Sequence, residues 1–226
     1  MKQVYCISGL GADERIFSRL KVPGVEFVYL KWFVPEKGES IAAYANRMSM
    51  QVREPRNPAG PHGNPVFLGV SFGGIMAIEL AKLYPAARVV LVSSVKSRKE
   101  LPAWMKWVGA LGLYRLVPSR PGSVTRSSAW LHEIGSDFLG AESEEEKRLR
   151  DEYVRKVDPA YLYWAVKQIV QWKNYWRPQA LHHIHGSKDK TFPIRGITAT
   201  HVISGGGHFM VMNRAEEMSR ILASIL

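Results

Sequence analysis

The stretch FLGVSFGGIMAIELA, residues 67–81, sets a single serine among three glycines between two apolar runs. Ser71 follows a run typical of a buried strand and precedes a run with helical character. A sharp strand-to-helix turn would hold this serine in a strained backbone conformation, and it needs glycine wherever a Cβ atom would collide with neighbouring backbone. The pattern predicts that the turn presents the Ser71 hydroxyl to a substrate. A glycine-rich turn with no catalytic role has the same spacing.

Six short runs of β-branched or aromatic residues, each bounded by turn residues, predict β-strands. They are residues 4–7, 27–30, 66–70, 89–92, 181–184 and 201–203. Helix-like stretches at 40–52 and 72–85 alternate with the first of these strands. Because the strands are continuously apolar and alternate with helices, we expect an α/β fold with a mostly parallel sheet covered on both faces.

Residues 96–178 interrupt this alternation, because no convincing strand occurs among them. Ser143 and Glu146 have the spacing of a capping box, and Asp158 followed by Pro159 is a typical helix start. We therefore expect a helical lid, inserted into the sheet domain between two of its strands.

The length of 226 residues and the 46% hydrophobic content fit one domain with an inserted lobe. We predict a core of residues 1–95 and 179–226 and a helical cap of residues 96–178. The single cysteine, Cys6, lies in an apolar run and fits a buried residue of a protein in a reducing compartment. Neither a signal peptide nor an apolar run of membrane-spanning length is recognisable, so we expect a soluble, cytoplasmic protein.

A serine nucleophile needs a histidine base and an acid that orients the base. In this architecture the acid and then the base follow the serine along the chain, at the carboxyl ends of later strands. Asp189 lies in the loop HGSKDKTFP after the fifth predicted strand, and His208 lies in the loop SGGGHFMV after the sixth. Ser71, Asp189 and His208 are therefore the candidate triad. Other aspartates compete for the acid role: Asp13, which precedes the serine, Asp137, and Asp151 and Asp158 in predicted lid helices.

These segments resemble the α/β-hydrolase family, in particular its small single-domain members with a helical cap. The resemblance runs from CISGLGADERIF through GVSFGG and IHGSKDKTFP to GGGHFMV, which is nearly the whole chain. It implies the α/β-hydrolase fold, with about six strands flanked by helices and an inserted lid. It also implies that Ser71 is the nucleophile, Asp189 the acid and His208 the base.

The resemblance further implies an oxyanion hole made by the backbone amides of Phe72 and Leu10. Many members of the family have His-Gly where this chain has Ser8 and Gly9. The reaction of such a triad requires no metal and no organic cofactor.

The net charge of +11 is spread along the chain, with +4 in residues 1–95, +5 in 96–178 and +2 in 179–226. One local concentration, residues 96–126, holds seven bases against the single acid Glu100. It is either a solvated basic face or a surface that meets an anionic substrate or lipid headgroups. We expect neither a nucleic acid partner nor integral membrane association.

Two groups of side chains have competing interpretations. One interpretation of His182, His183 and His185 is that they bind a metal ion. No further Cys, His or carboxylate set lies nearby at the spacing of metal ligands, so we favour the interpretation that they are ordinary strand and loop residues. Six tryptophans in the lid either line an apolar pocket above Ser71 or, as we favour for most of them, form the lid's own core. They are Trp104, Trp107, Trp130, Trp164, Trp172 and Trp176.

The sequence thus predicts a serine hydrolase that cleaves an ester-like bond of a small molecule with an apolar acyl group, through an acyl-enzyme. The same fold and constellation also serve C–C bond and thioester hydrolases of small metabolites, and ligand-binding proteins without turnover. These alternatives stay open at the level of sequence.

Overall fold

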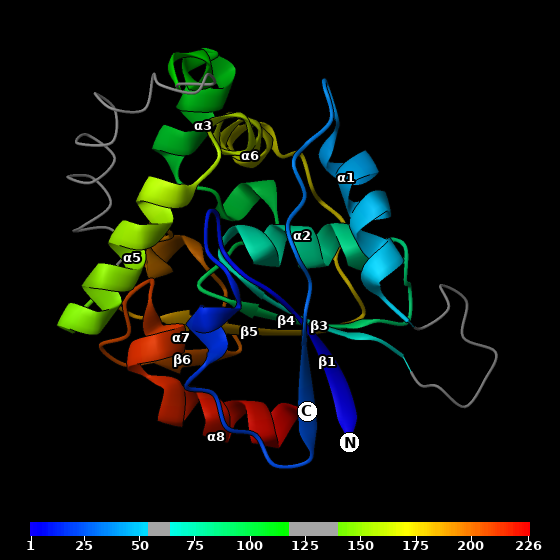
Figure 1. Cartoon of the computed structure of the whole chain (residues 1–226), viewed down its shortest axis with the longest axis vertical. Helices are drawn as coiled ribbons and strands as arrows, with labels where there is room; N and C mark the ends of the chain where they lie inside the picture. The colour runs from blue at the N-terminus through cyan, green and yellow to red at the C-terminus, as the bar shows by residue number, and fades with distance from the viewer. Residues whose placement is uncertain (54–63, 118–139) are drawn as a thin grey trace.

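The computed structural model describes residues 1–53, 64–117 and 140–226, and within these ranges it contains one sheet of six parallel strands (Figure 1). The strand order across the sheet is β2-β1-β3-β4-β5-β6, and every neighbouring pair is parallel. The strands are β1 (Lys2–Ile7), β2 (Val25–Tyr29), β3 (Val66–Val70), β4 (Arg88–Val92), β5 (Ala180–Gly186) and β6 (His201–Ile203). The six strands expected from the sequence are confirmed, each to within two residues of its predicted ends.

The helices that the sequence predicts begin at the residues that carry the capping signals. Ser143 and Glu146 form a complete capping box, and the Asp158 side chain accepts a hydrogen bond from the first turn of the next helix. In the described residues the α-helices are α1 (Ile41–Met48), α2 (Phe72–Ala81), α3 (Ala103–Ala110), α5 (Glu144–Lys156), α6 (Pro159–Gln171), α7 (Met210–Asn213) and α8 (Ala215–Ile225). Short 3₁₀ helices are η1 (Glu14–Phe17), η2 (Ser49–Gln51), η3 (Arg98–Glu100), η4 (Leu113–Leu116) and η5 (Ile194–Gly196).

Alternate residues of each strand pack into two hydrophobic layers, one on each face of the sheet. Tyr5 and Phe67 belong to the layer that includes α1 and α2, whereas Cys6 and Leu68 belong to the layer that includes η1 and α8. Figure 1 shows α1 and α2 above the sheet and α8 below it. Because both faces are covered, a central strand such as β3 is buried at every position and reads as continuously apolar.

The segment between β4 and β5 carries η3, α3, η4, α5 and α6 in its described part. Trp164 and Trp172 are buried in the same hydrophobic cluster as Tyr44 of α1 and Phe72 of α2. The indole Nε1 of Trp172 also donates a 2.8 Å hydrogen bond to the buried carboxylate of Glu79 in α2. Helix α6 therefore packs directly on the helical layer above the sheet. The division of the chain into core and cap stays a prediction.

The other tryptophans of this segment are less buried. Trp104, Trp107 and Trp176 are exposed, and Trp130 lies outside the described residues. The expectation that most of the six form the lid's own core is wrong. Trp164 and Trp172 are buried in the cluster that also contains α1 and α2, and α3 turns Met105 inward and Trp104 and Trp107 outward. In the described ranges, no helix is long and apolar enough to cross a bilayer.

Strand β5 carries a histidine into the buried interior of the protein. The Nε2 atom of His183 lies 3.1 Å from the backbone oxygen of Ser94, and because a carbonyl oxygen can only accept, Nε2 carries a proton. Burial, together with the neighbouring His185 and Lys96, lowers the pKa of His183 to about 3. The ring is therefore neutral in the folded protein at physiological pH.

We expect the free energy of unfolding to fall as the pH drops from about 6.5 toward 3, because in this window the unfolded chain protonates His183 and the folded chain does not. This single proton adds up to about 1.4 kcal/mol per pH unit to the slope of the unfolding free energy against pH. The measurement is urea unfolding at about pH 7 and about pH 5. Between these pH values His183→Gln, whose amide can still donate to Ser94, should lose less unfolding free energy than wild type does. An equal loss in both proteins would contradict a neutral, buried His183.

Candidate active site

Ser71 occupies the sharp turn between β3 and α2 that its sequence predicts. Its backbone has φ 54° and ψ −119°, a conformation that side-chain-bearing residues rarely adopt. The Ser71 amide donates to Val92 O at 3.0 Å, and its carbonyl accepts from the Ser94 hydroxyl at 2.6 Å and from the Gly74 amide at 2.9 Å. Hydrogen bonds from the neighbouring strand β4 and its following loop thus hold the strained residue in place.

The glycines around Ser71 are required by close backbone contacts. A Cβ atom on Gly69 would lie 2.3 Å from Gly73 O, and one on Gly73 would lie 2.2 Å from Ile7 O. A Cβ atom on Gly74 would lie 2.3 Å from the Ser94 hydroxyl. The start of α2 is therefore packed directly on β3, on the end of β1 and on the loop after β4, and larger residues would push the turn away from the sheet.

The three residues of the candidate triad form one hydrogen-bonded chain. His208 Nε2 lies 2.9 Å from Ser71 Oγ, and His208 Nδ1 lies 2.9 Å from Asp189 Oδ2. Because a carboxylate can only accept, Nδ1 carries the proton and Nε2 is free to accept from the serine hydroxyl. The structure thus brings together the three residues that the sequence singled out, although they come from three different loops.

Close contact between the loops after β5 and β6 fixes the distance between acid and base. A Cβ atom on Gly186, at the end of β5, would lie 2.2 Å from Gly206 O in the loop that carries His208. The amide of Lys188 donates to the same oxygen at 2.9 Å. The glycines of HGS and SGGGH therefore let the two loops approach as closely as neighbouring strands.

Asp189 is buried yet has a pKa below its usual range. Burial alone would raise the pKa, but the charge interaction and hydrogen bond with His208 and the amide of Phe192, 2.9 Å from Oδ1, outweigh it. The carboxylate therefore stays ionised and can hold a protonated His208.

His185 and Phe192 are two members of the site whose contacts the sequence did not reveal. His185 Nε2 lies 2.7 Å from Phe192 O and 3.6 Å from Asp189 Oδ2, so its proton points at the turn that carries the acid. The Phe192 ring packs edge-on against His208, with ring centres 5.7 Å apart. The one available signal was the sequence HGSKDKTFP itself, where His185 precedes and Phe192 follows the acid.

Phe72 and the loop that carries Leu10, which are expected to form the oxyanion hole, border Ser71. Phe72 is the first residue of α2, and the first amides of a helix lack an intrahelical partner. Gly9, which precedes Leu10, packs on Ser71, because a Cβ atom there would lie 3.4 Å from Ser71 Cβ. The loop after β1 is also bound to α5, since the Tyr153 hydroxyl donates to Asp13 at 2.7 Å.

An aromatic cluster lies beside the turn. Trp32, in the loop after β2, stacks on Phe72 with ring centres 5.1 Å apart and 6° between the ring planes. Trp164 and Tyr161 of α6 contact Phe72 and Trp32, respectively, at 5.9 and 5.6 Å. Trp32, the one tryptophan outside the predicted lid, thus packs directly on the residue that follows Ser71.

The rival candidates have other roles. Asp13 is bound by Arg15 and Tyr153, Asp151 pairs with Arg150, and Asp158 caps α6, whereas Asp137 lies outside the described residues. Among the residues that the structure describes, no three His, Cys, Asp or Glu side chains gather as a metal ion would require.

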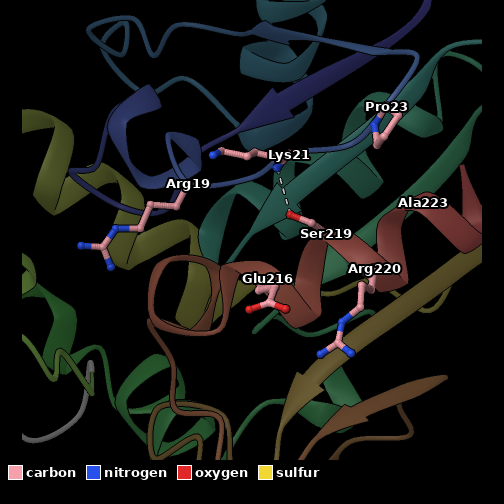
Figure 2. Close-up of a pocket in the computed structure, with 7 residues that line it drawn as sticks. All are labelled: Arg19, Lys21, Pro23, Glu216, Ser219, Arg220 and Ala223. Carbon is pink, nitrogen blue, oxygen red and sulfur yellow. Dashed lines mark hydrogen bonds between the residues drawn. The ribbon is translucent and has the colours of Figure 1, made fainter.

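A shallow hollow of about 410 Å³ lies elsewhere, between α8 and the chain that follows η1. Figure 2 shows its lining, where the Lys21 amide donates to Ser219 and the charged ends of Arg19, Lys21 and Arg220 spread apart rather than converge. Arg19 is already paired with Glu145 and Glu146 of α5. None of Ser71, Asp189 and His208 lines this hollow.

Comparison with known proteins identifies the architecture. A family model described as the alpha/beta hydrolase family matches residues 38–221, whereas no curated protein sequence matches the chain. Among solved structures, bromoperoxidase from Bacillus anthracis has a TM-score of 0.72 and 20% identity over 99% of this chain and 91% of that one. A thermophilic esterase from Thermogutta terrifontis has a TM-score of 0.69 and 16% identity, over 99% and 89%. A meta-cleavage product hydrolase from Pseudomonas fluorescens IP01 has a TM-score of 0.67 and 15% identity, over 100% and 90%. At these identities the likeness concerns the fold alone.

We expect Gly73→Ala to destabilise the protein by about 3 kcal/mol, because the new methyl group would lie 2.2 Å from Ile7 O, a backbone atom that cannot move aside. Gly196→Ala is the matched control, since the nearest atom to a Cβ there is Glu100 O at 3.7 Å. Urea unfolding of both variants should show a large shift of the midpoint for the first and little change for the second. A stable Gly73→Ala protein would contradict the close packing of the turn.

Proposed function

The chain belongs to the alpha/beta hydrolase family, and from that premise we propose that it is a serine hydrolase that cleaves an ester-like bond. The observation that carries the proposal is the unbroken chain of two 2.9 Å hydrogen bonds from Ser71 Oγ through His208 to the Asp189 carboxylate. This arrangement supplies what a serine hydroxyl lacks on its own, which is a base in contact and an ion that stabilises the base once it is charged.

In the first half of the reaction Ser71 Oγ attacks the carbonyl carbon while His208 Nε2 takes its proton. The tetrahedral intermediate collapses when the bond to the leaving alcohol breaks and His208 returns the proton to the alcohol oxygen. The product is an ester between Ser71 and the acyl group. Water activated by His208 then attacks this acyl-enzyme, releases the acid and restores the serine hydroxyl.

Asp189 has two tasks in this mechanism. It holds His208 in the tautomer whose Nε2 can accept a proton, and it stabilises the imidazolium that forms when the proton arrives. The lowered pKa of Asp189 suits both tasks, because the carboxylate stays charged throughout. The Phe192 amide donates to Asp189 and the Phe192 ring packs against His208, while His185 binds the backbone oxygen of Phe192. These contacts help to position the carboxylate and the base.

The amides of Phe72 and Leu10 are the proposed oxyanion donors. Each such donor lowers the barrier by on the order of 3 kcal/mol when it points at the oxygen of the tetrahedral intermediate. Because Gly9 packs on Ser71 and Phe72 begins α2, both amides belong to segments that border the nucleophile. The aromatic cluster of Trp32, Phe72 and Tyr161 beside the turn favours an apolar acyl group in the substrate.

We expect the purified protein to hydrolyse p-nitrophenyl esters and Ser71→Ala to reduce kcat/KM by on the order of 10⁶-fold. Asp189→Ala should cost less, on the order of 10⁴-fold, because the serine and its base remain. Ser224→Ala, at an exposed position in the last turn of α8, is the matched control and should keep the wild-type rate. Steady-state kinetics on esters from acetate to long acyl chains measures these ratios and the preferred chain length.

The same experiment distinguishes the bond type. A thioester with the preferred acyl group and a C–C substrate of the meta-cleavage type are assayed beside the ester. A kcat/KM at least tenfold in favour of the ester supports the proposal. If the enzyme prefers the thioester or the C–C substrate, and Ser71→Ala abolishes that activity, the proposed reaction is that one instead of ester hydrolysis. If Ser71→Ala still hydrolyses the substrate, the proposed site is wrong.

A further inference from the structure

Helix α3 and the turn that follows it present a row of large apolar side chains to solvent. Trp104, Trp107 and Leu111 follow the i, i+3, i+7 spacing of one helix face and are 52%, 65% and 65% exposed. Leu113 and Leu116 continue the row along η4 and are 45% and 81% exposed. We call these five residues the α3 patch. Figure 1 shows α3 beside α6 at the top of the view, at the end of the molecule away from α8.

The side chains that face inward explain why the patch points outward. Met105 is buried under α3, and a Cβ atom on Gly109 would lie 2.2 Å from Val170 O of α6. The inner face of α3 is therefore tightly packed on α6, and the tryptophans on the opposite face have no cover among the described residues. Contiguous exposed apolar side chains of this size on a monomer indicate an interaction surface.

The exposed charges of residues 96–117, the segment that carries the α3 patch, are all positive. Lys99 and Arg115 are exposed, and Lys106 extends from α3 to donate to Lys99 O at 2.9 Å. The only acid between residues 96 and 117, Glu100, is buried and binds the Lys96 ammonium and amide. The surface of this segment thus combines cations with no exposed carboxylate.

The neighbouring helix adds no negative charge. Helix α6, on which α3 packs, contains no Asp or Glu and contributes Lys167. Glu39, whose backbone oxygen binds the indole of Trp164 on α6, has its own carboxylate paired with Arg47. Residues 96–117 and helix α6 together therefore add cations and no exposed carboxylate to the α3 patch.

We propose that the α3 patch binds reversibly to the surface of a membrane that contains anionic lipids. Tryptophan is enriched at the level of the headgroups, leucine gains free energy below them, and lysine and arginine are attracted to anionic headgroups. The patch presents all three groups on one short helix and its turn. The proposal is independent of the proposed hydrolase activity, because no triad residue takes part.

Two other partners fit the surface less well. A second copy of the chain would bring the same cations together, and a chain with a net charge of +11 would repel its copy at this face. Single-stranded nucleic acid would suit the tryptophans and cations but not the three leucines, because bases stack on aromatic rings and phosphates bind cations. Charge complementarity together with the leucines favours an anionic lipid surface.

The test uses the purified full chain and vesicles of phosphatidylcholine with or without phosphatidylglycerol, with sedimentation of bound protein and the emission maximum of tryptophan as readouts. Wild type should bind the anionic vesicles with a blue-shifted emission, and added salt should weaken binding. Trp104→Ser with Trp107→Ser should bind at least tenfold more weakly. Lys99→Gln, Lys106→Gln and Arg115→Gln together should weaken binding by roughly a hundredfold at low salt.

Matched controls carry similar changes at exposed positions elsewhere. Val34→Ser with Met50→Ser and Lys188→Gln with Lys190→Gln should bind as wild type does, and circular dichroism should show every variant folded. Failure of folded wild type to bind anionic vesicles would overturn the proposal, and so would binding that both control and patch variants lose equally. Self-association or binding of single-stranded DNA that depends on the two tryptophans, without vesicle binding, would replace the membrane with that partner.

Discussion

The backbone conformation of Ser71 is the constraint on which the rest of the site depends. A positive φ angle at a serine costs on the order of 1 to 3 kcal/mol, so it persists only where the surroundings enforce it. Here the turn is held between the oxygen of Val92 and the hydroxyl of Ser94, while Gly69 and Gly73 let α2 approach the backbone of β3 and β1. Because the strain and the close packing occur at the same point, the Ser71 side chain is held in one orientation, with Oγ 2.9 Å from His208 Nε2.

The parallel sheet then brings the other groups to that hydroxyl. Strands that run in the same direction end at the same edge, so the loops after β3, β5 and β6 meet, although Ser71 lies more than a hundred positions before Asp189 and His208 in sequence. The close approach of Gly186 to Gly206 brings the loops of Asp189 and His208 together, and the ionised Asp189 lies 2.9 Å from His208 Nδ1. A second histidine, His185, binds the turn that carries Asp189, and burial lowers its pKa.

Much of this arrangement could be predicted from local sequence. Strands and helix starts follow from runs of apolar residues and capping signals, and Ser71, Asp189 and His208 follow from their position after predicted strands. The stacking of Trp32 on Phe72 could not be predicted, because it joins a loop and a helix start that no periodicity connects. The same holds for the exposed tryptophans of α3, because composition does not say which face of a short helix packs on its neighbour.

Covalent labelling with a fluorophosphonate decides whether His208 and Asp189 activate Ser71. Such a probe reacts with a serine only where a base removes the hydroxyl proton. We expect one label per folded chain, located by mass spectrometry on the peptide that contains Ser71, with labelling that is much slower in His208→Ala. A folded protein that takes no label, or that takes it on another residue, would rule out an activated Ser71.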